Sequence, residues 1–259
     1  MQIALLILGI AAGVLSGMFG IGGGVVIVPL LVTLFGYELQ AAVGTSLAAL
    51  LMPVGIFAVL EYWRAGKLRL PIAAIVAFGL IFGGLAGAEL ALSLPTATLQ
   101  RLYGLFLLYA SWRFMEPRKW LAQVRAHLPT PRDEETATTS AAWYVLLAVG
   151  LGAGVISGMF GVGGGIVIVP ALVTLLHFDQ KLAVGTSLGA LLLPVGLGAV
   201  LSYHNAGLLD IGAAVLLAIG LAAGAFFGAR IALSLPSATV KRLYGLFLLI
   251  VGLRFLLQA

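Results

Sequence analysis

Two glycine-rich runs inside apolar segments carry residue types that suit the binding of a small anion. The first, SGMFGIGGGVVIVP at residues 16–29, places five glycines within eight positions. Consecutive glycines do not share one helix face, so the run is typical of a turn. A helix that begins again near Gly23 presents N–H groups without helical acceptors and the positive end of its dipole, which favours an anion. A purely structural kink is the alternative interpretation.

Hydroxyl groups occur in a second repeated motif, AVGTSL, at residues 42–47 and 183–188. Each hydroxyl can donate a hydrogen bond to an oxyanion. Ser and Thr in membrane helices also bond their own preceding turn or a neighbouring helix, and this alternative stays open. The predicted substrate-binding residues are Gly20, Gly22, Gly23, Gly24, Thr45, Ser46, Gly161, Gly163, Gly164, Gly165, Thr186 and Ser187.

Both motifs belong to an internal repeat with a fixed offset of 141 residues. The stretch SGMFGIGGGVVIVPLLVTLF from Ser16 returns as SGMFGVGGGIVIVPALVTLL from Ser157, with 16 of 20 positions identical. Between the copies the composition shifts to charged residues, proline, Ser and Thr. We therefore predict a first transmembrane repeat at residues 1–112, a linker at 113–140 and a second transmembrane repeat at 141–259.

The composition is that of a multi-pass membrane protein, with 62% hydrophobic and 9% charged residues. Each half contains four apolar segments, which in the first half cover about residues 3–34, 39–60, 70–92 and 97–112. As a single helix the first segment would be about 48 Å long, whereas the hydrocarbon core of a bilayer is about 30 Å thick. A re-entrant hairpin that turns at the glycines fits this length, and such a turn is tolerated where it lines a cavity.

The distribution of basic residues tests this topology independently. If every apolar segment crosses the membrane, nine Lys and Arg residues lie on the linker side and five on the opposite side. If the first segment of each half is a hairpin, Lys181, Arg230, Lys241 and Arg242 join the linker side while Arg254 leaves it, and the division becomes twelve against two. Because basic residues collect in cytoplasmic loops, the second topology is favoured.

The predicted fold class is therefore an all-α polytopic membrane protein with two inverted-topology repeats. Each repeat comprises a glycine-broken re-entrant helical hairpin and three spanning helices. Both termini are predicted outside and the linker at 113–140 in the cytoplasm. Pro53 and Pro194 are predicted to kink the second segment of each half.

Glycines spaced by four residues suit close packing of membrane helices. Gly79, Gly83 and Gly87 form such a ladder, and Gly220, Gly224 and Gly228 repeat it. We predict that these ladders pack the third helices of the two halves against each other. A homodimer contact between two protomers is the alternative.

Other function classes are disfavoured. The chain contains no cysteine, which excludes disulfides, thiolate metal sites and cysteine nucleophiles. We find no paired carboxylates, no metal-spaced histidines and no nucleophile beside a base, so enzyme activity, a metal and a cofactor are not expected. The formal net charge of +5 fits cytoplasmic loops better than nucleic-acid binding, because no basic stripe or stacking aromatics accompany it.

The two copies of SGMFGxGGGxVIVPxLV, together with the two AVGTSL segments, resemble the TauE/SafE family of membrane transporters, also described as sulfite or organosulfonate exporters. The resemblance covers nearly all of both halves. It implies secondary transport, by export, of sulfite or a related small sulfur-containing anion across the cytoplasmic (inner) membrane of a prokaryote. It also implies that the glycine-rich segments form the substrate region. A passive small-anion channel on the same inverted scaffold is the competing hypothesis.

Overall fold

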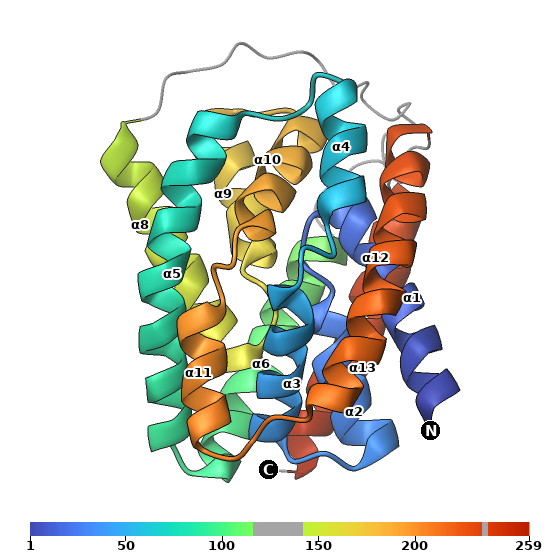
Figure 1. Cartoon of the computed structure of the whole chain (residues 1–259), viewed down its shortest axis with the longest axis vertical. Helices are drawn as coiled ribbons and strands as arrows, with labels where there is room; N and C mark the ends of the chain where they lie inside the picture. Colours follow the sequence, from blue (N-terminus) through green and yellow to red (C-terminus); the bar gives the residue numbers. More distant parts are fainter. Residues whose placement is uncertain (116–141, 235–237, 259) are drawn as a thin grey trace, which may run out of the picture. The chain divides into compact units, whose positions relative to one another are not determined.

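The computed structural model describes residues 1–115, 142–234 and 238–258, and within these ranges all regular structure is α-helical (Figure 1). The first half forms α1 (Gln2–Phe19), α2 (Gly24–Phe35), α3 (Leu39–Leu51), α4 (Ile56–Arg64), α5 (Leu70–Ser93) and α6 (Thr96–Met115). The second half forms α8 (Trp143–Phe160), α9 (Gly165–Leu176), α10 (Gln180–Leu192), α11 (Leu197–Asn205), α12 (Ile211–Ser234) and α13 (Ala238–Gln258). The predicted all-α polytopic fold class is confirmed for these ranges. Most of the predicted linker, residues 116–140, lies outside them.

The helices form two compact units that each combine parts of both sequence repeats. The first unit contains residues 1–93 and 136–234, and the second contains residues 94–135 and 235–259. Each repeat therefore contributes its first helices to one unit and its last helix to the other. In the second unit α6 packs on α13, and the Ser111 hydroxyl donates a hydrogen bond to the carbonyl of Gly245 at 2.7 Å.

The first apolar segment of each half breaks at the predicted glycines. Helix α1 ends at Phe19 because Gly20 adopts a left-handed conformation with a φ of 69°, and Gly22 and Gly23 follow with φ values of 83° and 75°. Only glycine adopts this conformation without steric cost, so the run stops one helix and starts the next. Helix α2 then returns toward the end of the unit at which α1 begins, as α9 does relative to α8 (Figure 1). Helices α1 and α8 begin at opposite ends of the unit (Figure 1).

The second apolar segment of each half is interrupted rather than only kinked. Helices α3 and α4 are bent by 51° at residues 52–55, and α10 and α11 are bent by 50° at the equivalent place. The break includes Pro53 or Pro194, whose ring removes an N–H donor and disfavours helical conformation in the preceding residue. Met52, which precedes Pro53, is accordingly extended with a ψ of 149°. The predicted kinks are thus sharper than expected.

Several helices are long and apolar enough to cross a membrane. Among the described residues these are α1, α5, α8 and α12, with two more spans if α3–α4 and α10–α11 each count as one. Large apolar side chains on these helices are exposed, for example Phe78, Phe82 and Phe227 at 57%, 54% and 58%. Lipid is the natural environment for such side chains. The chain is therefore a multi-pass membrane protein.

The glycine ladders pack, but against different partners from those predicted. The ladder of α5 faces α8, where a Cβ on Gly83 would lie 2.2 Å from the carbonyl oxygen of Leu151. The ladder of α12 faces α1, where a Cβ on Gly224 would lie 2.1 Å from the carbonyl oxygen of Ile10. The prediction that the two third helices pack on each other is wrong. The physical reason is that α1 and α8 carry small residues of their own, so that both backbones approach closely.

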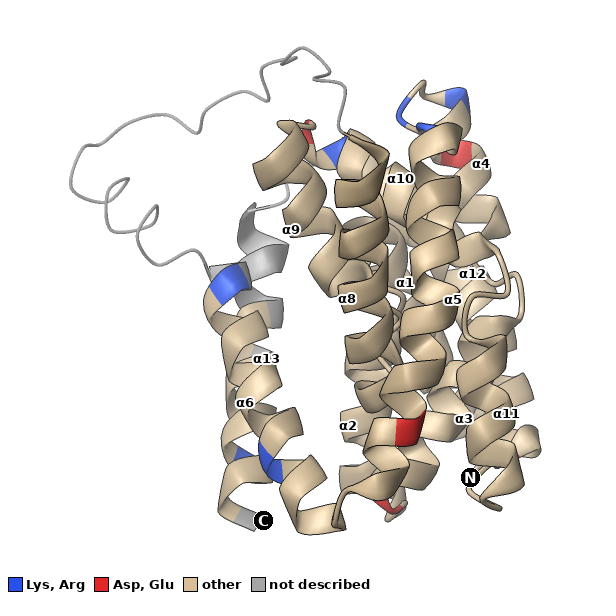
Figure 2. Cartoon of the chain, turned by 90° about the vertical axis from the view of Figure 1, so that its left-hand side faces the viewer, with Lys and Arg blue, Asp and Glu red and all other residues tan. Residues whose placement is uncertain are grey.

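Charged residues of the first unit divide between its two ends (Figure 2). Its five basic residues, Arg64, Lys67, Arg69, Lys181 and Arg230, gather at the end where α4 finishes and α10 begins. Glu61 is 3.5 Å from Arg230 and 3.6 Å from Arg64, which ties α12 to this group. Lys181 and Arg230 therefore lie at the same end of the unit as the loop after α4, and their side of the membrane stays a prediction. Glu38, Glu89 and Asp210 lie toward the opposite end.

Candidate functional site

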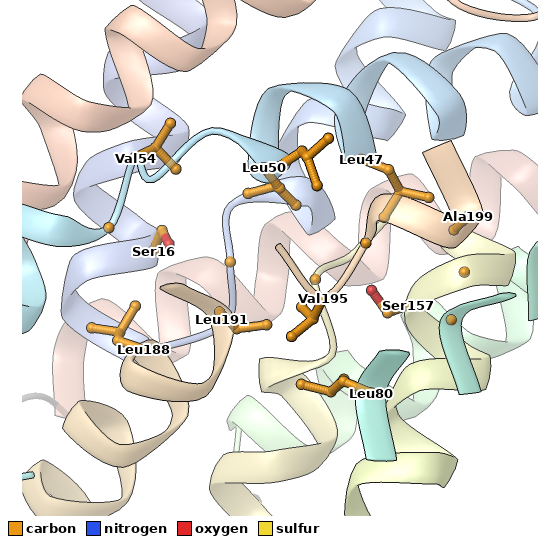
Figure 3. Close-up of a pocket in the computed structure, with 17 residues that line it drawn as sticks. Ser16, Leu47, Leu50, Val54, Leu80, Ser157, Leu188, Leu191, Val195 and Ala199 are labelled. Atoms are coloured by element: carbon orange, nitrogen blue, oxygen red, sulfur yellow. The ribbon is translucent and has the colours of Figure 1, made fainter. Parts of the chain in front are cut away.

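A cavity lies at the centre of the first unit, where the glycine turns of the two halves meet (Figure 3). Its volume is about 40 Å³. A cavity of this volume can hold a few water molecules. The walls are largely symmetric between the halves. The paired lining residues are Ser16 and Ser157, Gly22 and Gly163, Leu47 and Leu188, Leu50 and Leu191, Val54 and Val195, and Gly55 and Gly196. Leu51, Leu80, Gly84, Gly158 and Ala199 complete the lining.

Ser16 and Ser157 provide the only polar side chains among the 17 lining residues. They are only 6% and 9% exposed, and no hydrogen-bond partner is described for either hydroxyl within residues 1–115 and 142–234. Figure 3 shows both hydroxyl oxygens turned toward the space between the leucine and valine side chains. Buried hydroxyls normally have a partner, so two that face a cavity indicate a place for a polar ligand. Sequence reasoning missed them, although both open the repeated SGMFG motif.

The predicted glycines divide between lining the cavity and holding the turns together. Gly22 and Gly163 line the cavity and face each other, since a Cβ on Gly22 would lie 3.2 Å from the Cα of Gly163. The other six, Gly20, Gly23, Gly24, Gly161, Gly164 and Gly165, pack against neighbouring protein atoms. A Cβ on Gly24 would lie 1.8 Å from the carbonyl oxygen of Gly161. The two turns are therefore in direct backbone contact.

The hydroxyls of the AVGTSL motifs do not line the cavity. The Ser46 hydroxyl donates to the carbonyl of Gly161, and the Ser187 hydroxyl donates to the carbonyl of Gly20, each at 2.9 Å. Thr45 accepts from the N–H of Asp210 at 3.1 Å, and Thr186 accepts from the N–H of Arg69 at 3.2 Å. A hydroxyl has one proton to donate, so Ser46 and Ser187 have used theirs. Donation to an anion by these four residues stays a prediction.

The bonds from Ser46 and Ser187 satisfy carbonyls at the C-terminal ends of α8 and α1. These ends carry partial negative charge and lie at the glycine turns. Two tyrosines that sequence reasoning missed add to the effect. Tyr62 donates to the carbonyl of Gly17 at 3.1 Å, and Tyr203 donates to the carbonyl of Gly158 at 3.0 Å. Carbonyls at a helix C-terminus carry partial negative charge and repel an anion unless donors satisfy them. The N-termini of α2 and α9 lie just after Gly22 and Gly163, which line the cavity, and the positive end of a helix dipole favours an anion.

Polar contacts join the two halves at each end of the unit. At the basic end, the Lys67 ammonium lies 3.0 Å from a carboxylate oxygen of Asp179 at the start of α10. At the other end, the Tyr37 hydroxyl donates to Asp210 at 2.6 Å. Hydrogen bonds from the Ala213 N–H and from Tyr37 lower the pKa of Asp210. Burial and the nearby carboxylate raise the pKa of Tyr37 to about 12.

Comparison with known proteins is consistent with this geometry. The profile of a family described as "Sulfite exporter TauE/SafE" matches residues 5–255. The chain belongs to the TauE/SafE family. Similar sequences include the probable membrane transporter protein YdhB of Bacillus subtilis, 27% identical over 94% of this chain and 96% of the relative. The probable membrane transporter protein YunE of the same species is 28% identical over 99% of this chain and 97% of the relative. No solved structure matches.

TauE/SafE membership and these relatives make the chain a membrane transporter. A relative from Methanocaldococcus jannaschii, also named a probable membrane transporter protein, is 28% identical over 98% of this chain and 94% of its own length. No group of three or more His, Cys, Asp or Glu residues capable of holding a metal occurs in the described ranges.

Proposed function

We propose that this TauE/SafE protein is a secondary transporter that exports sulfite or a related small sulfur-containing anion across the cytoplasmic membrane. The observation that carries the proposal is the pair of buried hydroxyls, on Ser16 and Ser157, that face a central cavity and have no hydrogen-bond partner among the described residues. Sulfite is compact, negatively charged and rich in acceptor oxygens. The two hydroxyls and the backbone at Gly22 and Gly163 are complementary to such a ligand.

Alternating access supplies the transport cycle in this proposal. The Lys67–Asp179 contact closes the basic end, and the Tyr37–Asp210 contact closes the other end. The breaks at residues 52–55 and 193–196 separate α4 and α11 from the helices that line the cavity, and short breaks of this kind are natural hinges. Opening one end while the other stays closed would expose the cavity to one side at a time. The proposal places the basic end in the cytoplasm and both termini outside.

Binding by the purified protein tests the site. We expect isothermal titration calorimetry to detect sulfite binding to the wild type, and Ser16→Ala with Ser157→Ala to weaken it about tenfold or more, because two donors to a charged ligand are lost. Ser93→Ala is the matched control, since the Ser93 hydroxyl is exposed and bonds the carbonyl of Leu90 in its own helix. Equal sulfite affinity in the double variant and the control would contradict the site.

Flux into proteoliposomes separates a transporter from a passive anion channel. A transporter gives saturable uptake of radiolabelled sulfite. Unlabelled sulfite inside the vesicles accelerates this uptake by counterflow. Uptake that rises linearly with concentration and shows no counterflow would favour the channel instead.

A further inference from the structure

The central cavity contains no ionisable side chain. Its only polar side chains are those of Ser16 and Ser157, and the rest of the wall is glycine, alanine, leucine and valine. Ionisable groups on the helices around it are engaged or exposed elsewhere. On the lining helices these groups are Glu89, Tyr144, Lys181, Tyr203 and His204, and on the neighbouring α4 and α12 they are Glu61, Tyr62, Arg64 and Arg230.

None of these groups is among the residues that line the cavity. Glu89 accepts from Ser202, Lys181 donates to the carbonyl of Leu233, and Arg230 is beside Glu61. Tyr62 and Tyr203 each donate their hydroxyl proton to a carbonyl near the C-terminal end of α1 or α8. Tyr144, His204 and Arg64 are exposed. A ligand in the cavity therefore meets two hydroxyls, the backbone of glycine residues and apolar walls, and no charged side chain among the lining residues.

The charge of the ligand decides whether such a site can hold it. The cost of moving an ion from water into an apolar environment grows with the square of its charge, so a dianion costs roughly four times as much as a monoanion of the same size. Dipoles of N–H and O–H groups compensate one charge well, as at helix N-termini. A second charge is compensated most strongly by a cationic side chain, and Arg and Lys are common partners of phosphate and other highly charged oxyanions.

We infer that this cavity selects singly charged anions and excludes dianions. The inference rests on the anion site of the proposed function and specifies which ionic form that site takes. Sulfite then enters as hydrogensulfite, HSO₃⁻, and dissociates to SO₃²⁻ and H⁺ after release. Each transported ion carries its own proton, so the flux is coupled to pH without a titratable residue in the cavity.

Three ligands of different charge test the inference in calorimetric titrations of the full chain. Methanesulfonate is a monoanion at all working pH values, sulfate is a dianion, and sulfite changes from one to the other near neutral pH. We expect methanesulfonate to bind with the same affinity at every pH and sulfate to bind at least about tenfold more weakly. The apparent affinity for sulfite should fall about tenfold per pH unit above its second pKa, because only the monoanionic fraction is competent.

The outcomes separate this inference from the proposed function. Sulfate, or sulfite at high pH, binding as tightly as methanesulfonate would overturn the charge selection and leave the anion site in place. No binding of any of the three anions at any pH would overturn the site and the inference together.

A variant that adds a charge provides a second, independent test. The Leu191 side chain is next to Gly22, with its Cδ1 atom 3.5 Å from the position of a Cβ on that glycine. We expect Leu191→Lys to strengthen sulfate binding about tenfold or more relative to wild type. Leu191→Met is the matched control for the change in shape, and thermal unfolding reports whether each variant is folded. A folded Leu191→Lys protein that binds sulfate no better than Leu191→Met would overturn the inference.

Discussion

At the scale of single residues, the buried serines of the two repeated motifs, SGMFG and AVGTSL, differ in what their hydroxyls contact. Ser16 and Ser157 keep their hydroxyls for the cavity, whereas Ser46 and Ser187 bond carbonyls of the opposite half. The second pair is buried and joins segments more than 100 positions apart in the sequence. These hydroxyls therefore hold the two turns in register and satisfy the carbonyls of Gly20 and Gly161.

Removing one of these structural hydroxyls should lower stability. Ser46→Ala leaves the carbonyl of Gly161 without its hydroxyl donor in a buried position, which costs about 1–3 kcal/mol. Thermal unfolding in detergent, followed by circular dichroism, measures the change. Ser93→Ala, on the exposed end of α5, is the control and should unfold at the wild-type temperature. Equal unfolding temperatures for both variants would show that the buried bond adds no stability.

Asp210 should make stability depend on pH. Its pKa is lowered in the folded protein by hydrogen bonds from Ala213 and Tyr37. The Asp210 carboxylate therefore adds to the free energy of unfolding at pH values above its unfolded pKa of about 3.9. The contribution is lost as the pH falls through the lower folded value. Asp210→Asn keeps the capping group but removes the charge. We expect the difference in unfolding temperature between wild type and Asp210→Asn to narrow below about pH 4. A difference that is constant with pH would contradict this role.

At the scale of helices, close backbone contact between the halves depends on particular glycines. On α8, a Cβ on Gly150 would lie 2.3 Å from the carbonyl oxygen of Val76 in α5, whereas a Cβ on Gly152 would meet no atom within 4 Å. The two glycines are two residues apart in one helix. A substitution at Gly150 changes both helix propensity and packing, whereas the same substitution at Gly152 changes helix propensity alone.

Alanine at these two positions should act in opposite directions. Gly150→Ala forces α5 and α8 apart and should destabilise by about 1–3 kcal/mol, which is the usual cost of overpacking. Gly152→Ala should leave stability unchanged or raise it by about 0.5–1 kcal/mol, because alanine favours helix. Thermal unfolding of both variants in detergent distinguishes them. Equal losses would mean that helix propensity or lipid contact, rather than the α5–α8 contact, determines the role of these glycines.

At the scale of the whole molecule, the two ends of the first unit differ in charge. The end with Arg64 and Lys67 is basic, and the end with Glu38, Glu89 and Asp210 is acidic. If α1–α2 and α8–α9 are re-entrant, the loop after α4 and the loop after α11 lie on opposite sides of the membrane. If every apolar segment crosses, those two loops share one side.

Cysteine labelling decides between these topologies because the chain has no cysteine of its own. We expect a membrane-impermeant thiol reagent added to intact cells to label Asn205→Cys and not Arg64→Cys. Both sites should react once the cells are permeabilised, which is the control for accessibility. Labelling of both positions from the same side in intact cells would contradict the inverted arrangement.

The sequence by itself determined the local features of this protein. The glycine run predicts the turn between α1 and α2, since left-handed conformations at Gly20, Gly22 and Gly23 are a property of glycine wherever it occurs. The composition predicts a membrane protein, because the length and polarity of a span are set by the bilayer. The fixed offset of the repeat predicts two similar halves.

Only the tertiary structure decided which groups meet. The packing of α5 on α8 and of α12 on α1, the donation from Ser46 to Gly161, and the exposure of Ser16 and Ser157 to one cavity depend on contacts between distant segments. A sequence pattern reports which face of a helix is small or polar, but not which helix lies opposite. The choice between a hydroxyl that binds a ligand and one that bonds a carbonyl is made by that opposite surface, which is why the sequence identified the turns and missed the serines beside them.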